Sequence, residues 1–291
     1  MCRPLPVGRY FLFRETNKMK RFLPGTAALA ALCLSIPASA ADLPARVNKA
    51  PPALVSPAYD WSGFYLGVSA GYTFGDDEDI TTTGQAAANI TNVAIGARPG
   101  RVRLERDGFI GGGQMGYNWQ VSPNWVFGLE ADISYVDVRR DVTVVGISAA
   151  GAPLNNTFRT RMDYLGTVRG RIGYAWDRTL IYATGGLAYA EIENSVNFFG
   201  PAGQLQFTGN NRRTETGYTV GAGIEHAFAP NWTVKAEYLF YDLRDNTVNV
   251  AVIPGSNGAG TGYNSRFEND GHIVRAGLNY KFGGPGPGMR W

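Results

Sequence analysis

The residue types that most often carry out chemistry are scarce in this chain of 291 residues, which has two cysteines and two histidines. A hydrolytic site needs a nucleophile, a histidine and an acid that lie close together. Ser265 and Glu268 are near His272 in the sequence, but they form no recognisable motif, and His226 stands apart from them. The acidic run at residues 76–79 offers the ligand type that divalent cations prefer, yet such runs on loops are usually only solvated. We therefore predict that the chain is not an enzyme and holds no cofactor and no bound metal.

Charged residues that alternate with apolar ones are the more informative set. In the segment WTVKAEYLFYDL, which begins at Trp232, one phase is apolar and aromatic, whereas the other contains Lys235 and Glu237. A period of two residues with one apolar face predicts a β-strand. The same sorting of other segments places nine charges in the polar phase: Glu130, Asp132, Arg169, Arg171, Glu225, Lys235, Glu237, Arg275 and Lys281.

Eight segments of this kind follow one another along the chain. Each is about a dozen residues long, which is enough for a tilted strand to cross a bilayer. Their connections alternate between long polar stretches and short turns such as residues 122–124 and 229–231. This alternation is typical of a membrane barrel with tight turns at one rim and free loops at the other. The sequence thus predicts an all-β protein, an eight-stranded antiparallel up-and-down transmembrane β-barrel, with strands in 61–75, 108–121, 124–138, 161–176, 179–193, 214–228, 231–243 and 271–282.

The apolar phase is expected to face lipid. A soluble lipid-carrying barrel would turn this phase inward, but the interior of an eight-stranded barrel is only just wide enough for side chains to fill. A dozen or more aromatic rings would overfill it. In the segment 179–193 both phases are apolar, so neither is assigned to the interior. Aromatic residues near strand ends match an interfacial girdle, for which we predict Trp119, Trp125, Trp176, Trp232, Tyr280 and Phe282.

The polar phase then points into the barrel, where unpaired charges would be costly. Its acids and bases are nearly balanced, so we expect ion pairs and hydrogen bonds that plug the interior. The alternative is a narrow porin-like diffusion channel, in which the same charges line a water-filled path.

The N-terminal region predicts an export signal. A basic start at residues 19–21, an apolar run at 22–37 and the sequence Ala38-Ser39-Ala40 fit a secretory signal peptide that is cleaved between Ala40 and Ala41. Either Met1 or Met19 is the true start. Both cysteines and most of the excess positive charge lie before the cut, so the composition gives no argument for nucleic acid binding. We predict a signal peptide at 1–40, a proline-rich periplasmic linker at 41–60, the barrel at 61–282 and a Gly/Pro-rich extension at 283–291.

Several motifs resemble those of a known family. They are ADLP after the predicted cut, YDWSGFYLGVSAGYTFG at 59–75, VFGLEAD at 126–132, VRGRIGYAWDRTLIYATGGLAYA at 168–190 and the closing VRAGLNYKF at 274–282. These resemble the small outer-membrane β-barrel proteins of alphaproteobacteria, OmpA-like immunodominant surface proteins that are often labelled porin family. The resemblance covers nearly the whole predicted mature chain except the loops.

The resemblance implies a location in the Gram-negative outer membrane, with loops available to lipopolysaccharide or to host and surface ligands. It also implies that the barrel-assembly machinery reads the last strand through Phe282, although this chain continues for nine residues where relatives commonly stop. An association of some relatives with haem makes His272 and Tyr263 conceivable ligands in a third hypothesis, a haem or cation-binding receptor. We predict a surface protein that contributes to envelope integrity and has no nucleic acid partner.

Overall fold

The computed structural model describes residues 59–75, 78–104 and 106–282 of the chain. The predicted signal peptide with its cleavage point between Ala40 and Ala41, most of the predicted linker and the C-terminal extension lie outside the described residues. No helix within the described ranges is long and apolar enough to cross a membrane.

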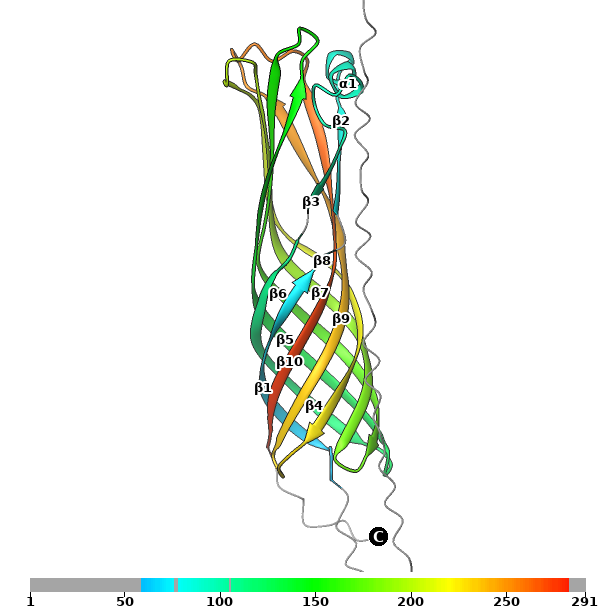
Figure 1. Cartoon of the computed structure of the whole chain (residues 1–291). Coiled ribbons are helices and arrows are strands. Elements are labelled where there is room, and N and C mark those ends of the chain that lie inside the picture. The colour runs from blue at the N-terminus through cyan, green and yellow to red at the C-terminus, as the bar shows by residue number, and fades with distance from the viewer. Residues whose placement is uncertain (1–58, 76–77, 105, 283–291) are drawn as a thin grey trace, which may run out of the picture. The chain divides into compact units, whose positions relative to one another are not determined.

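Antiparallel strands make up most of the described chain. Eight of them, β1 and β4 to β10, close into a ring, because β1 pairs with β4 on one side and with β10 on the other (Figure 1). The predicted eight-stranded up-and-down barrel is therefore confirmed. The elements within the described ranges are β1 (Gly63–Phe74), β2 (Glu78–Gly84), α1 (Ala87–Ala94), β3 (Arg101–Leu104), β4 (Gly108–Gln120), β5 (Trp125–Ile147), β6 (Pro153–Trp176), β7 (Thr179–Phe199), β8 (Leu205–Ala227), β9 (Trp232–Val252) and β10 (Gly262–Lys281).

The long connections are not free loops, which corrects the sequence-based expectation. β1 and β4 have 12 and 13 residues, but β5 to β10 have 20 to 24 residues each. Much of the stretches expected as loops is strand that continues the barrel wall far beyond the ends of β1 and β4 (Figure 1). The alternation continues there, and the inward-facing Phe158, Val196 and Phe198 are fully buried. We call this part the outer wall.

The first long connection completes the outer wall where β1 has ended. β2 pairs with the outer half of β10, from Tyr263 opposite Gly84 to Arg266 opposite Thr81, and β3 pairs with β2. Helix α1 lies at the outer end of the barrel beside β2 (Figure 1). Asn89 of this helix is fully buried, and its side chain bonds the carbonyl of Ala259 at 2.9 Å and the amide of Thr261 at 3.1 Å.

The outward face of the turn-end half of the barrel is apolar, as the period-two pattern predicts. Leu129 on β5, Val168 on β6 and Leu187 on β7 are all more than half exposed although they are large and hydrophobic. Exposure of such a surface to water would be costly, since the burial of apolar surface away from water is favourable. This band therefore faces lipid.

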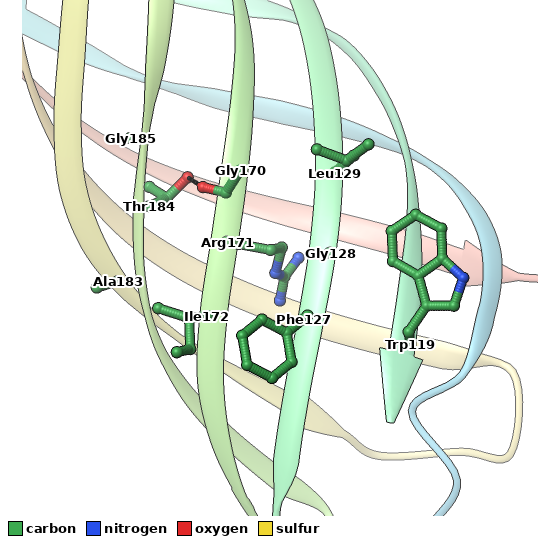
Figure 2. Close-up of a pocket in the computed structure, with 10 residues that line it drawn as sticks. All are labelled: Trp119, Phe127, Gly128, Leu129, Gly170, Arg171, Ile172, Ala183, Thr184 and Gly185. Atoms are coloured by element: carbon green, nitrogen blue, oxygen red, sulfur yellow. Dashed lines mark hydrogen bonds between the residues drawn. The ribbon is translucent and has the colours of Figure 1, made fainter. Parts of the chain in front are cut away.

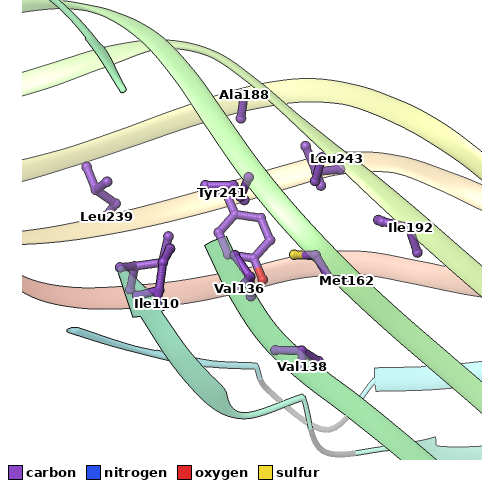
Figure 3. Packing of buried hydrophobic residues seen from close by; sticks show 12 residues of the cluster. Ile110, Val136, Val138, Met162, Ala188, Ile192, Leu239, Tyr241 and Leu243 are labelled. Atoms are coloured by element: carbon purple, nitrogen blue, oxygen red, sulfur yellow. The ribbon is translucent and has the colours of Figure 1, made fainter. Parts of the chain in front are cut away.

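Three apolar layers and one charged layer fill the interior within the described residues. The lower apolar layer lies at the end of the short turns and consists of Trp61, Val126, Ala175, Leu180, Tyr182 and Ala227. The middle apolar layer includes Ile110, Val136, Met162, Ile192, Leu239 and Tyr241, which Figure 3 shows converging from several strands. The upper apolar layer fills the outer wall and includes Ile80, Phe158, Phe198, Phe207, Val250 and Tyr263. The charged layer lies between the lower and middle layers.

Glycines inside the strands make room for large inward side chains. Gly116 is opposite Tyr65 in the pairing of β1 with β4, and a Cβ atom on Gly116 would overlap the tyrosine ring. A Cβ on Gly223 of β8 would likewise overlap the ring of Tyr182 from β7. The high glycine content therefore permits a tightly filled interior.

Candidate functional site

The charged layer is the most chemically distinctive part of the molecule. The nine predicted interior charges are all buried, with at most 8% of any residue exposed. Eight of them form one network: Glu130, Asp132, Arg169, Arg171, Glu225, Lys235, Glu237 and Arg275. These side chains come from β5, β6, β8, β9 and β10, and they meet because each occupies an inward position of its strand.

Glu130 is at the centre of the network. Lys235 Nζ donates to its two carboxylate oxygens at 2.8 and 2.9 Å, and Arg169 Nη2 donates to Oε1 at 2.5 Å. The Tyr65 hydroxyl, from β1, donates to Oε2 at 2.7 Å. This carboxylate is therefore surrounded by donors from β1, β6 and β9.

Arg169 and Arg275 join the remaining acids on the outer side of this centre. Arg169 Nη1 donates to Glu237 Oε1 at 3.0 Å, and its Nη2 donates to Asp132 Oδ2 at 3.0 Å. Arg275 holds Asp132 with two bonds, at 3.1 and 3.2 Å, and donates from Nε to Glu237 at 2.8 Å. Forked contacts of this kind fix the geometry as well as the charge.

Arg171 and Glu225 extend the network toward the turn end. Arg171 Nη2 donates to Glu225 Oε2 at 2.6 Å, and its guanidinium lies 4.1 Å from the centroid of the Tyr182 ring. The other oxygen of Glu225 accepts from Thr233 Oγ1 at 2.5 Å and from Asn279 Nδ2 at 2.9 Å. Among the residues that the structure describes, Arg171 is the ion-pair partner of Glu225, and polar side chains complete the bonds of this carboxylate.

The charges of the network are equal in number, with four carboxylates against three arginines and one lysine. A buried ion pair is stable only when the attraction and additional hydrogen bonds offset the loss of water. Here each carboxylate has at least one basic partner within 3.0 Å or a forked pair near 3.1 Å. The layer is therefore electrically neutral, bonded across the whole lumen, and bordered by apolar layers at both ends.

Lys281, the ninth predicted interior charge, lies apart from this network. It is at the turn end of β10, where its ammonium group donates to the carbonyl of Asp60 and lies 4.5 Å from the centroid of the Tyr59 ring. Burial raises the pKa of Tyr59 to about 12, so this ring stays neutral beside the cation. Lys281 thus helps to hold the start of the barrel strand β1 against the end of β10.

The six predicted interface aromatics all point outward near the turn end. Each is at least 37% exposed, and Trp125 and Trp232 begin the strands β5 and β9. Several of them pack against a neighbouring ring, such as Trp125 against Tyr174 and Trp232 against Tyr280, at ring distances of 5.7 and 5.1 Å. A ring of this kind fits the boundary between lipid and water.

The sequence interpretation missed several neutral members of the site. Tyr65 and Tyr182 donate hydroxyls to Glu130 and Glu237, and Gln114 Nε2 donates to Asn279 at 2.5 Å. Each alternates with outward apolar residues of its strand, such as Leu66, Met115 and Ile181, and this alternation is the signal that could have revealed them. Trp61, at 2% exposure, fills the interior on the turn side of the network, and the sequence interpretation did not assign it to the interior either.

The haem hypothesis does not fit the positions of its two candidate ligands. Tyr263 is completely buried in the upper apolar layer, where its ring packs against Phe198 and Phe207. His272 is on the outward side of β10, where its ring stacks beside Phe74 and its Nδ1 lies 2.7 Å from the Tyr238 hydroxyl. The two residues point to opposite sides of the wall and cannot bind one iron together. Ser265, the serine near His272 in the sequence, is also fully buried.

A separate groove of about 640 Å³ lies on the lipid-facing side of β4 to β7 (Figure 2). Gly170 and Gly185 are opposite each other in the pairing of β6 with β7, and their lack of side chains leaves the backbone bare. The Thr184 hydroxyl satisfies the Gly170 carbonyl at 2.9 Å, as Figure 2 shows. The rest of the lining is mainly hydrophobic and includes Trp119, Phe127, Leu129 and Ile172.

Comparison with known proteins agrees with this architecture. A family model described as outer membrane protein beta-barrel domain matches residues 26–282. The chain is 36% identical to the 31 kDa outer-membrane immunogenic protein of Brucella melitensis, over 84% of this chain and 93% of that protein. It is 30% identical to a 22 kDa outer membrane protein of Rhizobium leguminosarum, over 78% and 81% of the two chains. Among solved structures, OprG from Pseudomonas aeruginosa is similar with a TM-score of 0.44 and 14% identity, over 76% of this chain and 96% of that one.

Proposed function

Because the chain belongs to the outer membrane β-barrel family of small alphaproteobacterial proteins, we propose that it is a closed structural barrel of the outer membrane rather than an open pore. The observation that carries this proposal is the charged layer, in which ion-paired side chains of zero net charge span the lumen between the lower and middle apolar layers. Ions would have to break several ion pairs and also pass three apolar layers. Such a network holds the barrel together instead of conducting.

Planar-bilayer recording of the purified full chain tests the proposal. The closed barrel is expected to give no steady single-channel steps at neutral pH, whereas regular steps would contradict it and favour the narrow diffusion channel. The double substitution Glu130→Ala with Glu237→Ala further distinguishes the closed barrel from the diffusion channel. In a closed barrel it destabilises the fold, and in a pore it alters the preference of the channel for cations over anions.

We also propose that the outer wall is the part that meets the surroundings of the cell. Its outward face is rich in ion-paired charges, such as Arg159 with Asp141 at 2.7 Å and Arg212 with Glu191 at 2.8 Å. One similar protein is named an outer-membrane immunogenic protein, and a rigid, exposed wall would give antibodies a stable surface. Binding of antibodies raised against folded protein to intact cells checks this role, and binding only to broken cells would contradict it.

The other proposed partners are membrane lipid, lipopolysaccharide and the barrel-assembly machinery. The apolar outward band would be buried in membrane lipid, and the charges just beyond it would face lipopolysaccharide. Phe282, the last described residue, lies at the turn end beside Phe64 and Tyr280, where it is available to the assembly machinery. We assign the chain no catalytic role, since the buried acids and bases are occupied by one another.

A further inference from the structure

The lipid-facing groove of about 640 Å³ has a floor of two outward glycines, Gly170 on β6 and Gly185 on β7 (Figure 2). Leaving out the adjacent residues of the chain, a Cβ atom added to Gly170 would lie 3.9 Å from the nearest atom, and one added to Gly185 would lie 3.6 Å from it. Gly116 and Gly223, by contrast, make space for tyrosine rings of the interior. Among the described residues, no side chain uses the room above the two outward glycines.

Large outward side chains border this floor. Phe127 of β5 pairs with Ile172 of β6 on the turn side of the floor, and Leu129 is opposite the first of the two glycines. On the other side, the next outward residues of β6 and β7 are Val168 and Leu187, which are opposite each other and more than half exposed. These two side chains close the end of the groove that points toward the outer wall.

A further hollow connects the groove with the turn between β4 and β5. It has a volume of about 510 Å³, shares Phe127 and Ile172 with the first hollow, and extends to Val121, Ser122 and Trp125. The two hollows adjoin at the shared side chains and lead from the turn to the glycine floor. We call them together the glycine groove.

The glycine groove extends from the water boundary into the hydrocarbon. From Trp125 at the turn to Leu129, four residues of β5 cover about 13 Å at about 3.3 Å per residue. One half of the hydrocarbon core of a bilayer is about 15 Å thick, so the groove stays within one leaflet. Ser122 and the indole groups of Trp119 and Trp125 lie at its turn end, and the outward residues deeper in the groove are apolar.

A second lipid-facing groove shows what is particular to the first. It has a volume of about 450 Å³ and surrounds Gly113, where an added Cβ atom would also lie 3.9 Å from its nearest contact. Its lining residues all belong to the strands β1, β4, β5 and β7, and none belongs to a turn. The glycine groove therefore differs from it by having a polar end at the water boundary.

We propose that the glycine groove holds one acyl chain of a membrane phospholipid, with the ester group beside Ser122 and Trp125 and the methyl end against Val168 and Leu187. The groove is continuous with the outward band that faces lipid, so acyl chains are already present at its surface. Association of apolar groups within a bilayer depends on close packing, and a hollow contacts a chain on more sides than a flat wall does. The indole and hydroxyl groups at the mouth suit the polar end of the lipid.

The leaflet follows from the orientation of the barrel. The proposed function places the outer wall on the outside of the cell, so the turn end lies toward the periplasm. The bound phospholipid would then come from the inner leaflet, and this part of the inference rests on the proposed function. A lipid A molecule would belong to the opposite leaflet and should not compete for the groove.

Native mass spectrometry of the full chain tests the proposal. The protein would be incorporated into nanodiscs of phosphatidylethanolamine and transferred to mild detergent, and the phospholipid that stays bound would be measured. The unmodified protein should retain a phospholipid, whereas Gly170→Val with Gly185→Val, which fills the floor, should lose it. The matched control, Gly113→Val, places the same side chain in the second groove and should keep the lipid. A heat-dependent gel shift verifies that each variant is folded.

Several outcomes would overturn the proposal. They are release of all phospholipid from the unmodified protein, equal loss in the double variant and the control, and displacement of the phospholipid by an equal amount of lipid A. Dimers of the unmodified protein that disappear in the double variant would show instead that the groove is a contact between two copies of the chain. None of these outcomes depends on conductance, so planar-bilayer recording reveals a failure of the closed-barrel proposal separately.

Discussion

The turn-end half of the barrel and its outer wall are built from the same strands with opposite chemistry. On β5, Glu130 faces inward and Leu129 outward near the turns, whereas farther out Val144 faces inward and Asp141 outward. The period of two residues is unchanged along the strand. What changes is the medium outside, from lipid to water. The comparison teaches that the alternation defines the strand, while the surrounding medium decides which phase is apolar.

The largest expected effect comes from the charged layer of the turn-end half. Glu130→Gln leaves Lys235 and Arg169 without their shared carboxylate in a buried site. The free energy of unfolding should fall by about 3–5 kcal/mol, as for other buried pairs that lose one partner. Urea unfolding in lipid or detergent, followed by tryptophan fluorescence, measures this change.

The outer wall provides the control for that substitution. Asp141→Asn breaks an exposed pair with Arg159, in which both side chains are more than half exposed. Its effect should stay below about 1 kcal/mol. Equal losses in the two variants would show that the inner network contributes no more than a surface ion pair.

The boundary between lipid and water along β5 can be located by placing arginine at two heights on the outward face of this strand. Ile133→Arg puts the cation in the lipid-facing band and should cost about 2–4 kcal/mol near the bilayer midplane. Thr143→Arg, ten residues farther along the same strand and exposed, should change the stability by no more than about 0.5 kcal/mol. A large cost at Thr143 would mean that the membrane extends higher than the outward aromatic rings.

A smaller effect is expected in the upper apolar layer. Ile80→Val removes one methyl group from a completely buried residue of β2 and should cost about 0.5–1.5 kcal/mol. The loss should appear as faster proteolysis of the outer wall, with the heat-dependent gel shift of the barrel retained. Ile90→Val on the exposed face of α1 is the matched control, and it should leave the proteolysis rate unchanged.

The smallest effect is a local dependence on acid at the base of the outer wall. Hydrogen bonds from Tyr72 and Arg140 lower the pKa of Asp107 below its usual value. The stabilisation by this carboxylate is full above its ordinary pKa and is lost as the pH falls through the lowered value. Hydrogen exchange at Arg106 and Gly108 should therefore accelerate in acid, after correction for the intrinsic rate. Asp107→Asn should remove this acid dependence, and its persistence would place the titrating group elsewhere.

The lipid-facing half could be predicted because its alternation is strong and its inward phase is charged. Segments such as 125–135 and 232–240 sort cleanly into apolar and polar faces, and the structure shows the apolar face outward. The inward phase of β7 could not be assigned from the sequence, and the reason is physical. Within 179–193 its inward face passes through the lower and middle apolar layers, so Leu180 and Ala190 are buried inside while Leu187 is exposed to lipid.

The outer wall could not be predicted by the same reasoning, because its chemistry is reversed. A search for apolar outward faces interprets exposed Arg159, Arg212 and Arg266 as loop residues, although they lie on the water-facing side of regular strands. Nor does the sequence show the pairing of β2 with β10, which joins residues about 180 positions apart. The individual bonds of the charged layer were equally hidden, since alternation gives the direction of a side chain but not its partner.

The length of the outer wall determines which charges govern first encounters at the cell surface. On β6, eleven residues from Pro153 to Asp163 extend beyond Tyr164. They correspond to roughly 25–35 Å of height, given about 3.3 Å per residue and a tilted strand. The Debye length at physiological salt is about 8 Å. The tip is thus several screening lengths from the anionic membrane, and approaching molecules sense the charge of the protein there rather than that of the lipid.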